Sequence, residues 1–294
     1  MGNNKKRIIA DSELIINSDG SAFHIHLRPE HITDNIIICG DPGRVTMIAS
    51  HFDTRDLEIQ SREFHTIRGT YKGKDIMALS HGIGGDNIDI VMNELDALAN
   101  IDYNTREIKD THRTLSIVRV GTCGGLQPYV PIGTPIMATK GIGFDGVLNF
   151  YAGRNEICDL EFEKQFCDFV NWNPLFAEPY VVDADPELVE RIGGKDFFHG
   201  YTIAANGFYG PQGRQLRLAL AEPELNSRIE KFEYAGRNIT NYEMECAALQ
   251  GLAKLMGHKA LTVCSVIANR VATKMNTNYK NAVEDMIETV LDRF

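Results

Sequence analysis

The stretch LSIVRVGTCGG at residues 115–125 places the strongest constraint on the fold of this chain. Its first six residues are mostly apolar and β-branched, so they predict a buried strand. The glycines that follow predict an abrupt turn at the carboxyl end of that strand. Open α/β sheets bind ligands at such ends, and glycines allow successive backbone N–H groups to converge on an anion. Thr122 adds a hydroxyl donor, so the stretch predicts an anion site.

Arg119 is the one charged residue inside this apolar run. A charged side chain is rarely buried without a partner. Two alternatives are therefore open: Arg119 pairs with an acidic group of the chain, or it receives an anionic ligand. A tight turn beside a salt-bridged arginine is the simpler of the two.

Strand and helix patterns alternate along the rest of the chain, which predicts an α/β fold. The expected strands are 36–39, a pair joined at 72–74 within 61–80, 115–120, 134–139, 179–182, 198–205 and 259–268. The expected helices are 43–52, 87–98, 160–171, 186–193, 241–256 and 279–291. No linker or repeat interrupts this order, so residues 1–294 are expected to form a single domain, with 1–22 as a polar N-terminal arm.

Composition narrows the classes of partner. A formal net charge of −10 argues against binding to a nucleic acid polymer, whose phosphates require a basic face. No apolar run approaches the roughly 20 residues that a membrane span needs, and MGNNKKRIIADSEL has no signal-peptide core. The six cysteines include no C-x-x-C pair, which favours reduced thiols. A cytoplasmic protein is expected.

The sequence GIGFDG at 141–146 matches G-x-G-x-x-G, but its context is wrong for a dinucleotide site. That site needs a helix that opens at the third glycine and an acidic residue about 20 positions further on. Residues 147–151, VLNFY, suggest no helix start, so a dinucleotide-binding protein is rejected.

Two further segments carry candidate chemistry. FYGPQGR at 208–214 offers rings for stacking, an amide and a guanidinium, which suit a flat heterocycle; an ordinary Gly-Pro turn is the alternative. Glu243 and Glu245 lie in the expected first turn of the helix 241–256. Carboxylates there usually serve the helix dipole and capping. Two residues apart on a helix, they are expected to point in different directions.

Taken together and in this order, five segments resemble the nucleoside phosphorylase family, and within it most closely the uridine phosphorylases: GDPGRV at 40–45, HGIGG at 81–85, RVGTCGG at 119–125, FYGPQGR at 208–214 and NYEMEC at 241–246. The resemblance implies cleavage of a nucleoside by inorganic phosphate, giving a free base and ribose 1-phosphate, without an organic cofactor. It also implies a central mixed, twisted and partly barrel-like β-sheet flanked by helices.

The resemblance also implies roles for individual residues. The phosphate-binding group comprises Gly40, Arg44, Arg119, Thr122 and Arg62, the last reaching a neighbouring subunit's site. The nucleoside-binding group comprises His24, Cys123, Gly124, Phe208, Gln212, Arg214, Glu243, Met244 and Glu245. Glu245 matches the acceptor of the ribose 2′ and 3′ hydroxyls, and His24 matches a histidine lent by a neighbour to the 5′ hydroxyl. Arg119, Gln212, Arg214 and Glu245 are expected to carry catalysis.

Shared sites imply a homo-oligomer, at least a dimer, with a hexamer as the larger alternative. Some uridine phosphorylases hold potassium between subunits, and the matching donors here are Glu63, the Ile83 carbonyl and Asn87. Asn87 departs from the usual serine, which puts this ion in doubt.

The segment after the last expected core strand bears on the choice of base. Purine-specific relatives typically have an Asp after the last core strand, whereas this chain has SVIANR at 265–270, where Arg270 resembles the uridine phosphorylase ending. A phosphorylase acting on uridine, and on deoxyuridine or thymidine, is therefore favoured. A purine nucleoside phosphorylase and a non-catalytic nucleoside-binding protein are the alternatives. Cys123 replaces a common Thr or Ser, and Gly210-Pro211 inverts a Pro-Gly order.

Overall fold

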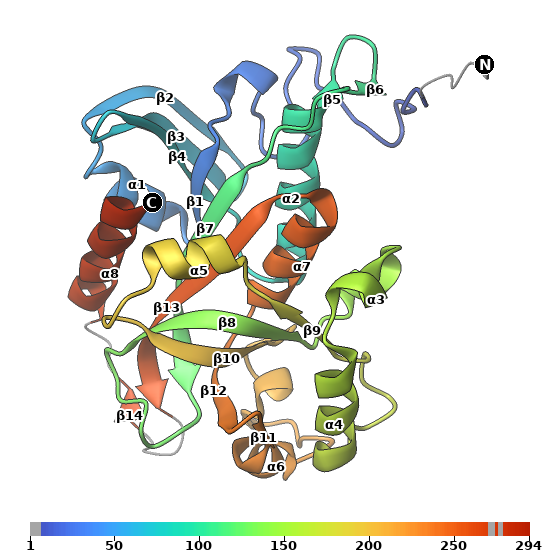
Figure 1. Ribbon diagram of the computed structural model, residues 1–294, viewed down its shortest axis with the longest axis vertical. Coiled ribbons are helices and arrows are strands. Elements are labelled where there is room, and N and C mark those ends of the chain that lie inside the picture. The colour runs from blue at the N-terminus through green and yellow to red at the C-terminus, as the bar shows by residue number, and fades with distance from the viewer. Residues whose placement is uncertain (1–6, 270–273, 276–278) are drawn as a thin grey trace. The chain divides into compact units, whose positions relative to one another are not determined.

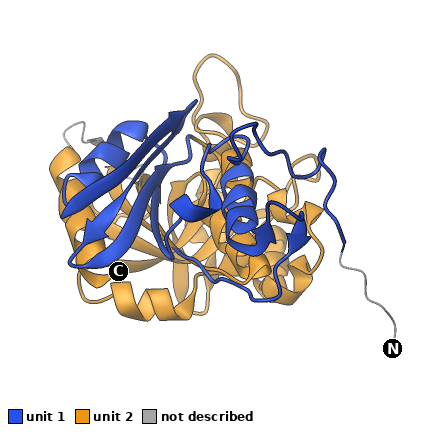
Figure 2. Ribbon diagram, turned by 90° about the horizontal axis from the view of Figure 1, so that it is seen from above, with its two compact units in different colours: residues 1–82, 90–116 blue, residues 83–89, 117–294 orange. Residues whose placement is uncertain are grey.

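The structure, a computed structural model, describes residues 7–269, 274–275 and 279–294, so Arg270 lies outside the described residues. The chain divides into two compact units, which Figure 2 colours separately. The first contains Met1–Gly82 and Ile90–Ser116, and the second contains Ile83–Asp89 and Ile117–Phe294. The expectation that residues 1–294 form one domain stays a prediction.

The first unit contains a four-stranded sheet in the order β1-β4-β3-β2, visible in blue and teal in Figure 1. β1 and β4 are parallel, and the other two pairs are antiparallel. Its elements are β1 (Asn35–Cys39), α1 (Pro42–Ala49), β2 (Thr54–Ser61), β3 (Phe64–Tyr71), β4 (Lys74–Ser80), most of α2 (Gly85–Asn100), β5 (Ile101–Asp102) and β6 (Glu107–Ile108). The hairpin joined at residues 72–74 and the two helices are as predicted.

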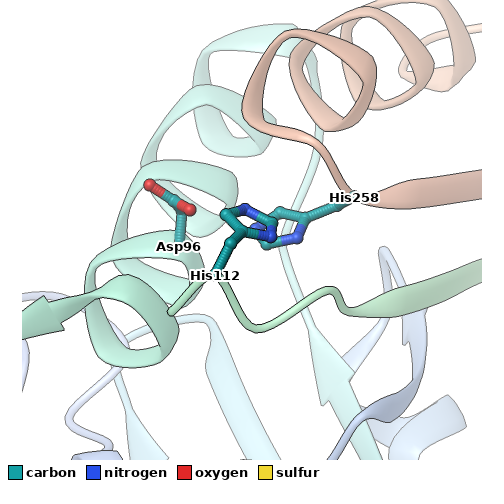
Figure 3. Close-up of side chains that lie close together, drawn as sticks. All are labelled: Asp96, His112 and His258. Carbon is teal, nitrogen blue, oxygen red and sulfur yellow. The ribbon is translucent and has the colours of Figure 1, made fainter. Parts of the chain in front are cut away.

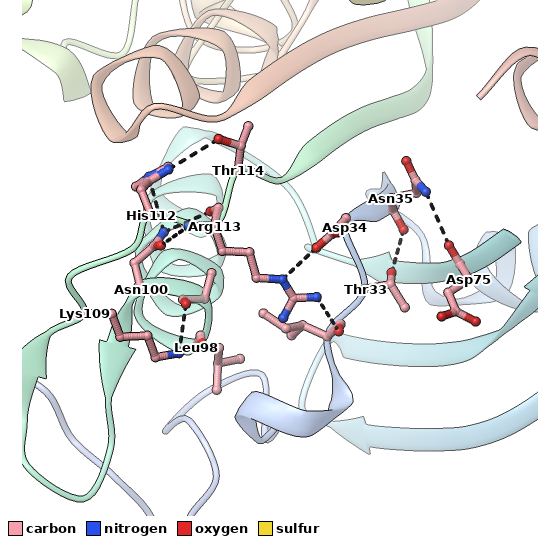
Figure 4. Close-up of polar contacts among 12 residues, drawn as sticks. Thr33, Asp34, Asn35, Asp75, Leu98, Asn100, Lys109, His112, Arg113 and Thr114 are labelled. Carbon is pink, nitrogen blue, oxygen red and sulfur yellow. Dashed lines mark hydrogen bonds and ion pairs between the residues drawn. The ribbon is translucent and has the colours of Figure 1, made fainter.

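Side-chain hydrogen bonds hold the segment between β6 and β7 against other parts of the first unit, to which it belongs (Figure 4). The amide of Asn100 accepts a hydrogen bond from the backbone N–H of Arg113 at 2.7 Å and donates one to its carbonyl at 3.2 Å. The Arg113 guanidinium donates to Asp34 at 2.6 Å. Figure 3 shows Asp96, on α2, and His112, in this segment; His258, also drawn, belongs to the second unit.

The second unit holds the longer strands and most of the helices. Its elements are β7 (Ser116–Gly125, from Ile117), β8 (Pro135–Gly143), α3 (Arg154–Ile157), α4 (Leu160–Val170), β9 (Tyr180–Asp183), α5 (Pro186–Ile192), β10 (Phe198–Ala204), α6 (Leu225–Lys231), β11 (Glu233–Tyr234), β12 (Arg237–Glu243), α7 (Cys246–Met256), β13 (Lys259–Asn269), β14 (Lys274–Met275) and α8 (Lys280–Arg293). No helix among the described residues is both long enough and apolar enough to cross a membrane.

Strand pairing in the second unit closes on itself. β7 pairs β13, β13 pairs β8, β8 pairs β10 and β10 pairs β12. β12 then returns to β7, with Tyr242 opposite Gly124 and Asn241 opposite Gly125. The ring mixes parallel and antiparallel pairs, so the mixed, partly barrel-like α/β fold that we expected is confirmed.

The turn predicted at residues 121–125 is wrong. β7 continues through all three glycines to Gly125, and none of them has a positive φ. At Gly121 the missing side chain leaves room for a neighbour: a Cβ would lie 2.6 Å from Nη1 of Arg119. These glycines therefore serve close packing inside a strand rather than a change of chain direction.

Close packing also explains GIGFDG. Gly141 and Gly143 lie in β8, where a Cβ would meet the Cα of Ala247 at 3.0 Å and the ring of Tyr180 at 2.2 Å. Only Gly146 has a positive φ, 74°, and a 3-10 helix rather than an α-helix follows it. The rejection of a dinucleotide motif agrees with this geometry.

The helix expected at 241–256 begins later, and its first part is a strand. Asn241–Glu243 end β12, and α7 starts at Cys246. Glu243 accepts hydrogen bonds from the backbone N–H groups of Glu245 and Cys246 at 2.9–3.0 Å. A carboxylate that satisfies the first amides of a helix ends the strand there, because those amides have no partner within the helix.

Candidate active site

Arg119 is the centre of the charged cluster in the second unit. It lies on β7, is 5% exposed, and pairs with two carboxylates. Nη1 lies 3.1 Å from Oε2 of Glu243, and Nη2 donates to Oε2 of Glu245. Of the two alternatives left open by the sequence, internal pairing is the one that the structure contains.

The expectation that Glu243 and Glu245 point in different directions is wrong, because the backbone between them is not helical. Glu243 ends a strand and Glu245 precedes the helix, so both side chains reach the same guanidinium. The other oxygen of Glu245, Oε1, accepts the backbone N–H of Gly84 at 2.8 Å. Glu245 is thus fixed from two sides.

The carboxyl of Glu245 is a weaker acid than an ordinary glutamate. Burial raises its pKa to about 7, the nearby charge of Glu243 acts in the same direction, and Arg119 opposes both. A carboxylate that titrates near neutrality while 3% exposed is typical of a functional site.

Gly121 gives a direct test of how tightly Arg119 is held. We expect Gly121→Ala to lower the free energy of unfolding by about 1–3 kcal/mol, because its Cβ would overlap the guanidinium and crowd Sγ of Cys264 at 3.1 Å. Urea unfolding measures this. Gly210→Ala is the matched control, since no atom lies within 4 Å of its added Cβ. Equal stability of the two variants would contradict the close fit.

Cys123 lies two residues after Gly121 on the same strand and is 5% exposed. Burial raises the pKa of its thiol well above the usual value. A buried thiol of raised pKa has little thiolate at neutral pH, which makes it a poor nucleophile. Thr122, by contrast, is half-buried, and Gly124 is buried opposite Tyr242.

The segment 208–214 brings an aromatic ring, an amide and a guanidinium together. The guanidinium of Arg214 lies 3.7 Å from the ring centroid of Phe208. It donates to Oε1 of Gln212 at 2.6 Å and to the Phe208 carbonyl at 2.5 Å. Gln212 is 3% exposed, whereas Phe208 is 49% exposed. A stacked, hydrogen-bonded guanidinium beside an exposed ring can hold a flat anion.

We expect Arg214→Lys to reduce kcat/KM for a nucleoside about 100-fold, because lysine keeps the charge but loses the stacking and the fork of donors. Steady-state kinetics at saturating phosphate measures this. Arg217→Lys, three residues further along the same exposed segment, is the control and should stay within about twofold. An equal loss in both variants would assign the effect to the segment as a whole.

In the first unit, Gly40 and Arg44 flank the start of α1. A Cβ on Gly40 would lie 2.9 Å from the Gly82 carbonyl, so the chain needs glycine there. Asp41 accepts the Gly43 N–H at 2.8 Å and caps the helix, and Arg44 follows in the first turn. Backbone N–H groups at a helix start favour an anion.

Arg62 and His24 also belong to the first unit. Arg62 is exposed in the β2–β3 turn with φ 55°, and its guanidinium lies 5.7 Å from the ring centroid of Phe23. His24 follows Phe23, and its Nδ1 lies 2.6 Å from Oε1 of Glu94 on α2. Sequence reasoning missed Glu94, because 70 positions separate it from His24.

The expected potassium donors have the right chemistry, since carboxylate, carbonyl and amide oxygens all suit a hard cation. Glu63 follows Arg62 in the first unit; Ile83, 70% exposed, and Asn87, in the first turn of α2, belong to the second. The potassium ion stays a prediction.

Comparison with known proteins gives evidence on the family that is independent of the site geometry. The family model of the phosphorylase superfamily matches residues 34–294. The chain belongs to the phosphorylase superfamily. Together with the relatives described next, this match confirms the resemblance to nucleoside phosphorylases, and to uridine phosphorylases most of all. Uridine phosphorylases are enzymes, so the chain is an enzyme of this family.

Individual phosphorylases show how far the similarity extends. A protein named uridine phosphorylase from Thermococcus kodakarensis is 30% identical over 262 residues, covering 87% of this chain and 80% of that protein. The Escherichia coli uridine phosphorylase is 28% identical, with 92% and 97% covered. A solved Trypanosoma brucei nucleoside phosphorylase, described as showing uridine phosphorylase activity, superposes with a TM-score of 0.86 at 26% identity, covering 95% of this chain and 98% of that one.

Proposed function

We propose that this phosphorylase cleaves uridine with inorganic phosphate to uracil and ribose 1-phosphate, and that it accepts deoxyuridine or thymidine. The observation that carries the proposal is Glu245, a buried carboxylate fixed between Arg119 and the Gly84 N–H. Such a carboxylate can accept hydrogen bonds from two adjacent sugar hydroxyls. The names of the relatives at 25–30% identity support uridine as the nucleoside.

In the proposed reaction, a phosphate oxygen forms a bond to C1′ while the bond from C1′ to the base nitrogen breaks. The sugar becomes cation-like and the departing base takes up the electron pair, as in glycoside cleavage. Gln212 and Arg214 face the charge on the base, and Glu245 holds the ribose. Arg119, Thr122, Gly40, Arg44 and Arg62 are proposed to hold phosphate. Phosphate serves as co-substrate, with no organic cofactor.

A pyrimidine rather than a purine is favoured by Asn269, the residue that ends β13. Its amide donates to the carbonyls of Gln127 and Val130 at 3.0 and 2.8 Å. This side chain therefore holds the 127–130 turn, and it carries no acidic proton for a purine N7. Residues 265–269 include no Asp.

We propose that the enzyme is at least a dimer, with His24 and Arg62 serving the site of a neighbouring copy. The exposure of Arg62 and of the adjacent Phe23 ring, 37% exposed, supports this. Sedimentation showing a fully active monomer would refute it. The six free cysteines support a reducing compartment, the cytoplasm.

The decisive experiment measures uracil release from uridine by the purified protein, with and without phosphate, and includes inosine as a second substrate. We expect uracil only when phosphate is present, together with ribose 1-phosphate. Release without phosphate would identify a hydrolase. Cleavage of inosine alone would identify a purine enzyme, and no cleavage of either would favour a nucleoside-binding protein.

A further inference from the structure

In the first unit, the carboxylate of Glu94 accepts hydrogen bonds from the backbone of two consecutive residues, His24 and Ile25. Its two oxygens accept the backbone N–H of His24, each at 3.0 Å, and Oε2 accepts the N–H of Ile25 at 2.9 Å. The same carboxylate meets the imidazole Nδ1 of His24 at 2.6 Å. Two consecutive amides and one ring nitrogen therefore converge on a single side chain that is 15% exposed.

The two backbone amides decide the protonation state at the ring. An amide N–H can only donate, so it requires an acceptor, and an ionised carboxylate accepts through both of its oxygens. The ring nitrogen that faces the same carboxylate must then be the donor. In a neutral imidazole, a proton on Nδ1 leaves Nε2 without one, as a hydrogen-bond acceptor.

The ring is also held in position by its neighbours. The Phe23 ring packs edge-on at a centroid distance of 4.7 Å, and the Phe64 ring lies at 6.4 Å. Burial, and after it the negative charge of Glu94, raises the pKa of the Tyr103 phenol. These contacts fix the plane of the His24 ring.

We propose that Glu94 is a positioning residue that holds His24 with its proton on Nδ1, so that Nε2 accepts a hydrogen bond from a ligand hydroxyl. Within the proposed function, on which this inference rests, that group is the 5′ hydroxyl of uridine. A histidine in the other tautomer would present N–H to this oxygen and would accept nothing from the hydroxyl.

The kinetic test uses uridine and 5′-deoxyuridine, which lacks the hydroxyl in question. Glu94→Gln places an amide beside the ring. The glutamine amide has a single oxygen, which is needed to accept the backbone N–H groups of His24 and Ile25. Its NH₂ group then donates to Nδ1 of His24, which favours the tautomer with the proton on Nε2. We expect kcat/KM for uridine to fall about tenfold, and that for 5′-deoxyuridine to change by less than about twofold.

A similar pair elsewhere in the first unit supplies the control. Nε2 of His65 lies 2.9 Å from Oε1 of Glu58, which is 68% exposed, and neither residue belongs to the proposed phosphate or nucleoside site. Glu58→Gln should leave the ratio of kcat/KM for uridine to kcat/KM for 5′-deoxyuridine unchanged. An equal fall for both substrates in Glu94→Gln would mean that Glu94 only supports the fold, and the inference would be overturned.

A second readout needs no turnover. Nitrogen NMR of protein labelled in histidine, with the His24 signal assigned by its loss in His24→Asn, distinguishes the two tautomers directly. We expect Nδ1 to be protonated in the wild type and Nε2 in Glu94→Gln. A wild-type signal with the proton on Nε2 would overturn the proposal. Absence of uridine cleavage by the wild type would instead refute the proposed function, while the tautomer would still be measured.

Discussion

Replacement of Arg119 by alanine is expected to abolish phosphorolysis, with kcat/KM lowered at least about 1000-fold. The guanidinium aligns Glu245 and offers positive charge where phosphate is proposed to bind. The substitution also removes the only positive partner that the described contacts give to Glu243 and Glu245, both 3% exposed. Breaking a buried ion pair from one side costs about 3–5 kcal/mol of stability.

The pH dependence of that stability loss identifies its cause. Without Arg119 the folded-state pKa of Glu245, already raised by burial, should rise further, so this carboxyl protonates more readily in the folded chain than in the unfolded one. The stability that this proton contributes is present at low pH and is lost as pH rises through the folded-state pKa of Glu245. Urea unfolding of Arg119→Ala at several pH values should show the smallest deficit in acid.

Arg154 is the matched control for Arg119. It also belongs to the second unit, pairs with the largely buried Glu163 at 2.8 Å, and is 13% exposed. Arg154→Ala should lower stability by a comparable amount while leaving kcat/KM within about twofold of the wild type. Near-wild-type turnover by Arg119→Ala would refute the role assigned to this arginine.

The second large effect is expected from Glu245→Gln. Glutamine keeps the size but loses the charge that Arg119 pairs with and half of the acceptor capacity for the ribose hydroxyls. We expect kcat/KM for uridine to fall about 100-fold or more. The loss should appear mainly with substrates that carry both the 2′ and the 3′ hydroxyl, so deoxyuridine should lose less than uridine.

Uridine binding should also depend on pH through Glu245. Because its folded-state pKa is raised to about 7, the ribose acceptor is mostly protonated below neutrality. Affinity for uridine should therefore rise as pH increases through about 7 and then level off. Calorimetry in phosphate-free buffer measures this without the titration of phosphate itself.

The raised pKa of Glu245 also makes the stability of the folded chain depend on pH, in the direction opposite to that of uridine binding. The folded state binds this proton more tightly than the unfolded state, whose carboxyl has the ordinary value of 4.5. Its contribution to stability is complete below that value and is lost as pH rises through about 7. Glu245→Gln should remove this pH dependence from both uridine affinity and the free energy of unfolding. Glu163→Gln, at another buried carboxyl of raised pKa, should leave uridine binding pH-dependent.

Sequence periodicity was reliable where one local signal decided the structure. The β3–β4 hairpin, α2 and α8 followed from hydrophobic spacing and turn residues, because each buries one face that the pattern marks. It failed at 121–125 and 241–245. At 121–125 the choice between a turn and a strand depends on which side chain packs against the glycines. At 241–245 the choice between a strand and a helix depends on which groups the two carboxylates contact.

The sequence by itself determined the alternation of strands and helices, the family, and the residue types of the site from Arg119 to Glu245. Only the tertiary structure decided how these side chains meet. β7 runs through its glycines and pairs β12, so Arg119 lies between Glu243 and Glu245, 126 positions away from the latter. Likewise, Glu94 reaches His24 across 70 positions. Local patterns report which face a residue buries, whereas the partner of a buried charge depends on chain pairing that no local pattern contains.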